Sequence, residues 1–452
     1  MMDIQEPARR TRVIGEYEVV VLGGGPAGLL AAAAAARHGA SVVLVERYGF
    51  LGGMGTAAGV SNFCGLHANV RGEIRQVVHG TVDELLDRMR ALDGLNEPHE
   101  LFGRIRAQAY DLSAYKCAAD QLLEASGASV LFHALAVGVV HNDDGQPDVL
   151  LLETKSGRVG VRGRVFIDCS GDADLAHWAG VPYEKGDAGQ MLYPTLMFKV
   201  GNVDAGRAGE AWRVIPRLMD EAEAEGAFRF PRRGAIVRPQ KRPYEWRVNV
   251  TQLRQPDGSA ADGTDVQSLT EAELEGRRQI VNFVQFLRAR VPGFENAYIL
   301  DIAPQVGIRE TRRILGEAVV TRDDVVQCVD FDDSIGVNGW PLEIHAAGDV
   351  KWVWPEPGSR GYNQLPYRML LPRQDAGIHN LLVAGRCASM THEGQSAARV
   401  SGSCFVMGEA AGTAAAMAVR ATPAGIARPA GIDITLLQRK LEEQGVFLGR
   451  DE

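Results

Sequence analysis

Two histidines in the second half of the chain are suited to proton transfer. His392 lies in THE, shortly after an apolar run that ends at Gly385, and a histidine side chain titrates near neutral pH. We therefore expect His392 to act as an acid or base, with His345 as the second candidate. The alternative for His392 is a histidine fixed by a local hydrogen bond.

Three arginines stand close together in the segment GIRETRRILGE and are suited to binding an anion. A guanidinium group matches a carboxylate or an enolate oxygen with paired hydrogen bonds. Arg309 and Arg312 are therefore expected to bind substrate, whereas Arg313 is expected to pair with neighbouring glutamates. A structural cluster of all three is the alternative. The segment GYNQLPYRMLLP adds Asn363 and Tyr367 as candidate substrate-binding residues, although aromatic side chains more often pack in a core.

The elements that must position these residues begin with the stretch Tyr17–Arg47. An apolar run precedes Gly23, Gly25 and Gly28 at GxGxxG spacing, and a second β-branched run ends at Glu46, 18 positions after Gly28. This order predicts a strand, a tight turn, a helix and a parallel strand that bind a dinucleotide. The pyrophosphate approaches the helix N-terminus, and Glu46 accepts hydrogen bonds from ribose hydroxyls. An ordinary βαβ unit is the alternative.

Further small-residue segments indicate that the dinucleotide is FAD. Residues 52–56 (GGMGT) form a second glycine loop, which an extended FAD needs for close backbone approach; a flexible loop is the alternative. Residues 168–174 (DCSGDAD) end an apolar strand, and their aspartates serve either as helix caps or as cofactor contacts. Gly402, Gly408 and Gly412 allow a helix to pack closely on the flavin or on the first helix.

We predict an α/β fold in which a Rossmann-like FAD-binding domain of the glutathione-reductase type (GxGxxG) carries an inserted α+β substrate domain. The FAD-binding domain comprises residues 1–185, with a helical excursion at 66–100, and returns at residues 373–420. Residues 186–372 form the insertion. Residues 421–452 are expected to form a C-terminal linker and helix.

The motifs GGGPAG, GGMGT, IDCSGDAD, GIRETRRILGE and LLVAGRCASMTHEGQSAARV, in this order, resemble the FAD-dependent oxidoreductase family called FAD_oxidored, which is related to fumarate reductase and succinate dehydrogenase flavoproteins. The resemblance runs from Tyr17 to about Arg420 and implies FAD as the cofactor. One departure is Arg386, which stands where many FAD proteins have an aspartate that holds ribitol. Together with the glycine motifs, the resemblance assigns cofactor contacts to Gly23, Gly25, Pro26, Ala27, Gly28, Glu46, Arg47, Gly52, Gly53, Met54, Thr56, Ala136, Ser170, Gly171, Gly385, Arg386, Arg399, Ser401 and Gly402.

Hydride transfer at a flavin needs a substrate carbon held over N5, a proton donor or acceptor, and positive charge near N1 and C2=O. A helix beginning near Ser401 supplies that charge by its dipole, and Arg386 is a second candidate. We expect a dehydrogenase or oxidase of a small polar organic substrate, with oxygen or another external electron acceptor. A fumarate-reductase-like reductase of an activated C=C bond is the alternative. A flavin-fold binding protein without turnover is another.

The composition of the 452-residue chain argues against other classes of protein. Its formal net charge of −9 argues against a nucleic-acid binder. We expect no stretch to provide the ~20 apolar residues that span a bilayer, and therefore a cytoplasmic protein without membrane insertion. None of the six cysteines stands at CxxC spacing, so neither a metal site nor a redox disulfide is expected. The sequence leaves open whether the protein forms a homo-oligomer and whether the flavin is attached covalently.

Overall fold

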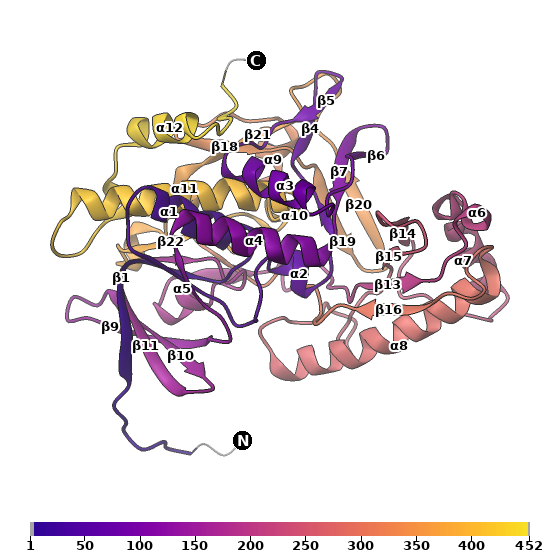
Figure 1. Ribbon diagram of the computed structural model, residues 1–452, viewed down its shortest axis with the longest axis horizontal. Helices are drawn as coiled ribbons and strands as arrows, with labels where there is room; N and C mark the ends of the chain where they lie inside the picture. The colour runs from indigo at the N-terminus through magenta and orange to yellow at the C-terminus, as the bar shows by residue number, and fades with distance from the viewer. Residues whose placement is uncertain (1–3, 451–452) are drawn as a thin grey trace.

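A seven-stranded sheet forms the centre of the computed structural model, which describes residues 4–450 (Figure 1). Five strands run parallel in the order β8-β2-β1-β11-β22. β10 extends the sheet by pairing antiparallel with β11, and β9 pairs antiparallel with β10. Continuous apolar runs suit parallel strands, because helices cover both faces of such a sheet. The strands are β1 (Arg12–Leu22), β2 (Val42–Val45), β8 (Ser129–Leu131), β9 (Leu135–His141), β10 (Pro147–Thr154), β11 (Gly157–Asp168) and β22 (Leu381–Val383).

Two helices rich in small residues pack against each other beside this sheet. They are α1 (Pro26–Arg37) and α11 (Ser401–Ala421). A Cβ atom on Gly408 would lie 2.1 Å from the carbonyl oxygen of Ala27, and one on Gly412 would lie 2.1 Å from that of Ala31. These two glycines therefore let α11 pack closely on α1. The sequence had predicted close packing either on this first helix or on the flavin.

The helix α11 also corrects the expectation that no segment is apolar enough to cross a membrane. It is 21 residues long and apolar enough to cross a membrane by length and composition. The apolar part is completely buried inside the protein, where α11 packs on α1 and on α12 (Ile434–Glu443). A helix that is apolar all round and fully enclosed is the pattern of a core helix.

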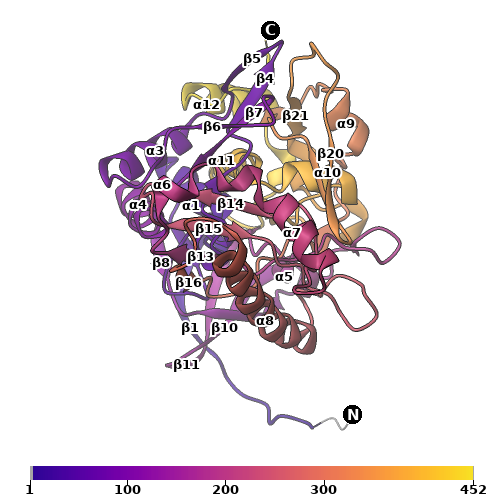
Figure 2. The same ribbon diagram turned by 90° about the vertical axis from the view of Figure 1, so that its right-hand side faces the viewer.

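A second hydrophobic core surrounds the sheet β14-β15-β13-β16. The helix α8 (Val266–Arg290) covers it with Phe283, Phe286 and Leu287, which helical spacing places on one face. Figures 1 and 2 show α7 and α8 on the side of the molecule away from α1 and α11. The other elements of this part are β13 (Phe198–Gly201), α6 (Ala205–Ala208), α7 (Ile215–Ala224), β14 (Ile236–Pro239), β15 (Trp246–Asn249) and β16 (Tyr298–Ile302).

The segment after the second core returns to the first one. β18 (Ser334–Asn338) pairs with β21 (Asn363–Pro366), and β19 (Leu342–Ala346) pairs with β20 (Asp349–Val353). Ile335, Leu342 and Leu365 belong to the same hydrophobic core as α1 and α11. Shorter elements connect these parts: α2 (Met54–Ala57), β3 (Asn62–Phe63), β6 (His99–Leu101), β7 (Ile105–Ala109), α4 (Leu112–Ser126), α5 (Asp174–Trp178), β12 (Tyr183–Lys185), β17 (Arg312–Ile314), α9 (Arg322–Val326) and α10 (His392–Ala398).

The predicted helical excursion at residues 66–100 is wrong in its first part. β4 (His67–Val70) and β5 (Glu73–Gln76) form a hairpin, and α3 (Thr81–Ala91) supplies the helix of this segment. Arg71 and Gly72 at the hairpin turn have φ values of 52° and 101°. Two successive positive φ values interrupt a right-handed helix and are typical of a two-residue hairpin turn. The turn at Arg71 and Gly72 therefore makes a hairpin of a segment that was predicted to be helical.

Candidate active site

The carboxyl ends of the parallel strands open into a cavity of about 410 Å³. Leu22, Cys169 and Ala384 line it at the ends of β1, β11 and β22. Loops with free backbone groups converge at this edge of an open α/β sheet, and ligands bind there for that reason. Ile236 of β14 and Arg247 of β15 line the same cavity, so it extends from the nucleotide-binding sheet to the second sheet.

Glycines let the backbone itself form one wall of the cavity. Gly23 has a φ of 97°, and a Cβ atom there would lie 2.5 Å from the carbonyl oxygen of Cys169. Gly53 has a φ of 52°, and its Cβ would lie 2.7 Å from the Cα of Gly25. The two predicted glycine loops therefore touch backbone to backbone beside the N-terminus of α1. A bare backbone surface at a helix N-terminus is what a pyrophosphate group requires.

Glu46 follows β2 and lines the cavity next to these loops. Its Oε2 accepts a hydrogen bond from the backbone N–H of Gly24 at 2.7 Å, and its Oε1 accepts one from that of Tyr48 at 2.9 Å. Burial raises the pKa of Glu46, and these two hydrogen bonds act against that rise. Each carboxylate oxygen has further capacity to accept a hydrogen bond. The side chain is thus held where it can accept ribose hydroxyls.

Arg386 follows β22 and brings a cation to the predicted cofactor loops. Its Nη2 donates to Asp172 Oδ1 at 2.9 Å, whereas its buried Nη1 has no hydrogen-bond partner among residues 4–450. A Cβ atom on Gly171 would lie 2.8 Å from Nη2, so the glycine leaves room for the guanidinium group. Arg386, which stands where many FAD proteins have an aspartate, therefore brings one satisfied and one unsatisfied donor to the cavity.

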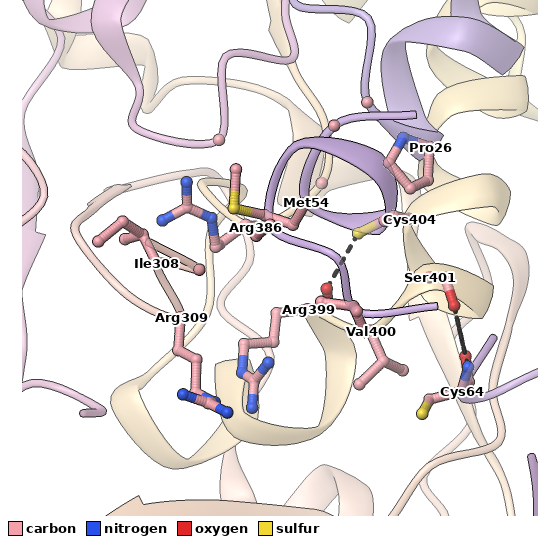
Figure 3. Close-up of a pocket in the computed structure, with 18 of the residues that line it drawn as sticks. Pro26, Met54, Cys64, Ile308, Arg309, Arg386, Arg399, Val400, Ser401 and Cys404 are labelled. Atoms are coloured by element: carbon pink, nitrogen blue, oxygen red, sulfur yellow. Dashed lines mark hydrogen bonds between the residues drawn. The ribbon is translucent and has the colours of Figure 1, made fainter. Parts of the chain in front are cut away.

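Two further arginines lie next to each other in the cavity (Figure 3). Arg309 Nη1 donates to the carbonyl oxygen of Tyr193 at 2.7 Å and to Thr195 Oγ1 at 2.8 Å. Arg399 follows α10, and its buried Nε and Nη2 have no partner in the described part of the chain. Burial lowers the pKa of Arg309, and the neighbouring Arg399 lowers it further. Two adjacent cations, of which Arg399 keeps two buried donors unsatisfied, form a site for an anion.

The cavity as a whole carries an excess of positive side chains, although the chain has a net charge of −9. Clefts lined by an excess of one sign concentrate ligands of the opposite sign. Six arginines and four carboxylates line it: Arg47, Arg238, Arg247, Arg309, Arg386 and Arg399, with Glu46, Glu100, Asp174 and Glu343.

Glu343 and His345 form a pair on β19, where residues two apart point to the same face. His345 Nε2 lies 3.1 Å from Glu343 Oε1, and the indole N–H of Trp340 donates to Oε2 at 3.0 Å. Burial lowers the pKa of His345, and Arg309 lowers it further. Burial opposes ionisation of Glu343, but His345, Arg399 and Arg309 lower its pKa to about 2. At neutral pH, a neutral imidazole therefore donates through Nε2 and keeps Nδ1 as a proton acceptor.

His392, the first candidate for acid–base chemistry, does not line this cavity. Its Nδ1 lies 2.8 Å from Glu310 Oε2, and Glu310 also accepts from the backbone N–H of Leu192 at 2.8 Å and pairs with Arg313. The local hydrogen bond that was the alternative for His392 is thus present, and the pairing of Arg313 with a neighbouring glutamate is as expected. His345 is the predicted histidine that the fold brings into the cavity.

Three predicted substrate-binding residues also lie outside the cavity lining and have partners elsewhere. Arg312 Nη1 donates to Asp174 Oδ1 at 2.9 Å. Asn363 accepts from Asn338 Nδ2 at 2.9 Å in the pair of strands β18 and β21. The hydroxyl of the buried Tyr367 donates to a backbone carbonyl oxygen at 2.9 Å. Their polar groups are satisfied within the protein, which is the pattern of structural residues.

Most of the predicted cofactor contacts surround the cavity. Gly28, Gly52, Thr56 and Gly402 stand behind its wall and shape the loops that form it. A Cβ atom on Gly28 would lie 1.8 Å from the carbonyl oxygen of Gly23, and one on Gly402 would lie 2.3 Å from that of Gly65. The residues that line the cavity are Gly23, Gly25, Pro26, Ala27, Glu46, Arg47, Gly53, Met54, Ala136, Ser170, Gly171, Gly385, Arg386, Arg399 and Ser401.

Reasoning from the sequence missed four charged residues that line the cavity: Glu100, Arg238, Arg247 and Glu343. Glu343 stands two residues before His345, so strand alternation was a signal that the two share a face. Arg247 has no such signal, because its position against Cys64 and Tyr110 depends on the packing of β15. Long-range packing, and not local spacing, decides which arginines face the cavity.

A Rossmann-like sheet with a glycine-lined cavity at its carboxyl edge, continuous with a cationic pocket, defines a dinucleotide-dependent enzyme. The chain belongs to the FAD dependent oxidoreductase family, whose model matches residues 18–441. The protein is therefore an FAD-dependent oxidoreductase with FAD as its cofactor, and the alternative of a binding protein without turnover is set aside. No curated protein matches the chain.

Solved structures similar to this chain have low sequence identity. A geranylgeranyl bacteriochlorophyll reductase-like protein from Thermoplasma acidophilum is 14% identical, with 96% of this chain and 84% of that chain covered and a TM-score of 0.48. The p-nitrophenol 4-monooxygenase from Pseudomonas putida is 13% identical, with 97% and 90% covered and a TM-score of 0.47. A myxobacterial chondrochloren halogenase is 12% identical, with 95% and 79% covered and a TM-score of 0.45. The family assignment rests on the family model and not on these similarities.

The residues of the cavity fit FAD. The close approach of Gly25 and Gly53 provides bare backbone for a pyrophosphate, and Glu46 provides acceptors for ribose hydroxyls. The unsatisfied Nη1 of Arg386 provides a donor to an anionic or carbonyl group. The helix α11 begins at Ser401, as expected, and Ser401 lines the cavity, so the positive end of that helix dipole faces the ligand.

Proposed function

We propose that this enzyme transfers a hydride between the flavin and a small organic acid, as a dehydrogenase or oxidase. The observation that carries the proposal is Arg399, whose Nε and Nη2 are buried at the cavity without a partner among residues 4–450. A buried donor left unsatisfied costs ~1–3 kcal/mol, so a ligand that satisfies it binds with that advantage. A carboxylate between Arg399 and Arg309 would accept from both guanidinium groups and neutralise their repulsion.

The FAD in this proposal lies across the sheet as in domains of the glutathione-reductase type. The parallel order β8-β2-β1-β11-β22 and the antiparallel extension β10-β9 support this assignment. We also propose that residues 186–372 supply the substrate site, because Arg309 and Glu343 come from this range. The last part of this range packs on the nucleotide-binding core, so the separate substrate core is smaller than predicted. When bound, FAD supplies the hydride acceptor or donor at N5.

His345 is the proposed base. Its neutral imidazole keeps Nδ1 free to accept a proton from the substrate, while Nε2 donates to Glu343. The carboxylate of Glu343 holds the ring in this tautomer and stabilises the imidazolium ion that proton transfer creates. Trp340 donates to the same carboxylate and fixes its position. His392 is assigned to the support of Glu310 and has no part in proton transfer.

The alternative reaction is reduction of a C=C bond conjugated to a carboxylate, as in fumarate-reductase-type flavoproteins. The pair Arg309 and Arg399 favours it as a second candidate, because two cations stabilise the enolate-like charge that develops when a hydride adds to such a bond. In this direction His345 would have to gain a proton before it could donate one. The lowered pKa of His345 makes it a better base than acid at neutral pH, and oxidation is therefore the preferred direction.

The experiment that tests the proposal follows the flavin absorbance of the purified enzyme without oxygen. A set of 2-hydroxy and saturated carboxylic acids is expected to bleach the oxidised flavin, whereas the matching primary alcohols are not. If dithionite-reduced enzyme is instead reoxidised by unsaturated acids, the second reaction replaces the first. Reduction by the alcohols but not by the acids would refute an anion site at Arg309 and Arg399.

The remaining features of the proposal concern the surroundings of the enzyme. We propose a cytoplasmic protein, without membrane insertion or nucleic acid, that passes electrons to oxygen or to another external acceptor. Oxygen consumption coupled to oxidation of an acid would identify an oxidase. Turnover that requires an added dye under air would identify a dehydrogenase. The oligomeric state, for which a homo-oligomer is open, is measured by light scattering.

A further inference from the structure

Four aromatic side chains form a continuous row from the interior of the cavity to the protein surface. Trp340 is buried, and its ring centroid lies 6.0 Å from that of Trp352. Trp352 is stacked on Trp354 at 5.7 Å, and Phe102 lies edge-on to both rings at 5.2 Å and 6.0 Å. We call these four residues the aromatic row. Phe102, Trp340 and Trp352 line the same cavity as the arginines.

The inner end of the aromatic row is joined to the anion site. Trp340 donates its indole N–H to Glu343. The positive charges of Arg399 and Arg309, together with the hydrogen bond from His345, lower the pKa of that carboxylate. The outer end is cationic too, because the guanidinium group of the exposed Arg104 lies 5.4 Å from the ring centroid of Trp354. A molecule whose anion is held by the arginine pair therefore has a wall of aromatic rings beside it on the path to the surface.

Phe102 is the residue of the aromatic row that contributes least to the folded core. Its side chain is 66% exposed, and its φ of 57° lies in the left-handed region at the turn between β6 and β7. A phenylalanine in this conformation is strained, since glycine or asparagine is the favoured residue there. An exposed aromatic ring in a strained turn at the mouth of a cavity offers its face to a ligand rather than to the core.

We infer that the substrate is an aromatic carboxylic acid, whose carboxylate lies between Arg309 and Arg399 and whose flat ring packs on Phe102 and Trp352. The inference rests on the proposed function, because the anion site orients the molecule. One feature supports an aromatic group over an alkyl chain. The row offers ring faces and edges at spacings that suit aromatic pairs, and such pairs add attraction beyond the burial of area.

Binding of 2-naphthoate to the FAD-loaded enzyme tests this inference, with acetate as the carboxylate that lacks a ring. Both dissociation constants are measured by calorimetry and by perturbation of the flavin absorbance. We expect 2-naphthoate to bind at least ~10-fold more tightly than acetate, and Phe102→Ala to weaken 2-naphthoate ~5- to 10-fold while leaving acetate unchanged. Tyr244→Ala is the matched control, because Tyr244 is 47% exposed and does not line the cavity. It should change neither constant.

Three results would overturn the inference. One is 2-naphthoate that binds no more tightly than acetate. Another is a Phe102→Ala variant that binds 2-naphthoate as the original enzyme does. The third is a variant that loses both ligands equally, since that would mean a general disturbance of the turn. Because Phe102 is exposed, its replacement is not expected to prevent folding.

A separate variant distinguishes failure of this inference from failure of the proposed function. Arg399→Met should weaken 2-naphthoate and acetate alike if the arginine pair holds the carboxylate. If Arg399→Met changes neither ligand but Phe102→Ala still weakens 2-naphthoate alone, the anion site of the proposed function fails and the aromatic site stands. If Arg399→Met weakens both and Phe102→Ala weakens neither, the proposed anion site stands and the aromatic site fails.

Discussion

Replacement of Arg399 by methionine should make the protein more stable and its substrate binding weaker. Methionine has a similar length and no charge, so it fills the space of the arginine without its unsatisfied donors. Arg399 is buried beside Arg309, and Nε and Nη2 have no partner within residues 4–450. The variant therefore removes the repulsion with Arg309 and the unsatisfied donors, together with the attraction between Arg399 and Glu343. Burial outweighs that attraction, because the pKa of Arg399 is lowered overall.

The expected magnitudes follow from these contacts. Hydrogen bonds to charged groups contribute ~1.5–3 kcal/mol, so loss of the bonds to a carboxylate should raise its dissociation constant ~10- to 150-fold. Removal of unsatisfied buried donors should raise the free energy of unfolding of the ligand-free protein by about 1 kcal/mol or more. Replacement of buried charges by apolar side chains of similar volume is neutral or stabilising in other proteins for the same reason.

The assay combines denaturant unfolding of the FAD-loaded protein with calorimetric titration of acetate. Arg313→Met is the matched control, because Arg313 is also a buried arginine but is fully engaged. Its Nε donates to the carbonyl oxygen of Met390 at 2.9 Å, its Nη2 donates to that of Gly186 at 3.0 Å, and it pairs with Glu310. Loss of one partner from a buried pair costs ~3–5 kcal/mol, so this variant should be strongly destabilised.

The reasoning is refuted if Arg399→Met is destabilised like Arg313→Met and still binds acetate normally, because Arg399 would then be a structural residue. Loss of FAD from Arg399→Met, with acetate binding unaffected in the fraction that keeps FAD, would also refute it. That outcome would return Arg399 to the cofactor contacts suggested by its position in the sequence. The two measurements thus separate three roles of one side chain.

Three further predictions concern the base, the cofactor site and the core. His345→Gln should slow flavin reduction ~10²-fold or more. In the unmodified enzyme the rate of flavin reduction should stay constant as the pH falls past 6.5, because burial and Arg309 lower the pKa of His345. His392→Gln should leave the rate nearly unchanged and lower the melting temperature. Gly53→Ala should abolish FAD binding, because the new Cβ would lie 2.7 Å from the Cα of Gly25 in a strained conformation, and absorbance at flavin wavelengths measures this. Burial raises the pKa of Glu409 from 4.5 to about 7. The free energy of unfolding should therefore fall by on the order of 3 kcal/mol as the pH rises from 4.5 through 7. Glu409→Gln should remove this pH dependence, as measured by denaturant unfolding.

Each of these predictions has a result that contradicts it. Equal slowing by His345→Gln and His392→Gln would mean that the cavity histidine is not the base. Normal FAD content in Gly53→Ala would mean that the two glycine loops move apart when FAD binds. A pH slope that persists in Glu409→Gln would assign the titration to another buried group, such as Asp174, whose pKa is raised to about 6 by burial and by Asp172 and Asp168.

The nucleotide half of the site was predictable because its signals are local. Gly23, Gly25 and Glu46 lie within one βαβ unit, where spacing along the chain sets spacing in space. The parallel pairing of β1 with β2 and β11, and the close packing of Gly408 and Gly412 on α1, agree with what those segments predicted. By contrast, a helix was predicted where residues 67–76 form a hairpin. The hairpin forms because the positive φ values at Arg71 and Gly72 interrupt a helix there.

Local spacing was enough to predict a dinucleotide on a Rossmann-like sheet, because glycines and one acidic residue at set intervals meet that requirement, and the later glycine-rich segments narrowed the dinucleotide to FAD. Tertiary packing alone brings Arg399 and Arg309 together at the cavity, puts His345 and not His392 in it, and joins Phe102 to Trp352. These residues come from segments far apart in the chain. Their meeting depends on the packing of two hydrophobic cores, which no local spacing encodes.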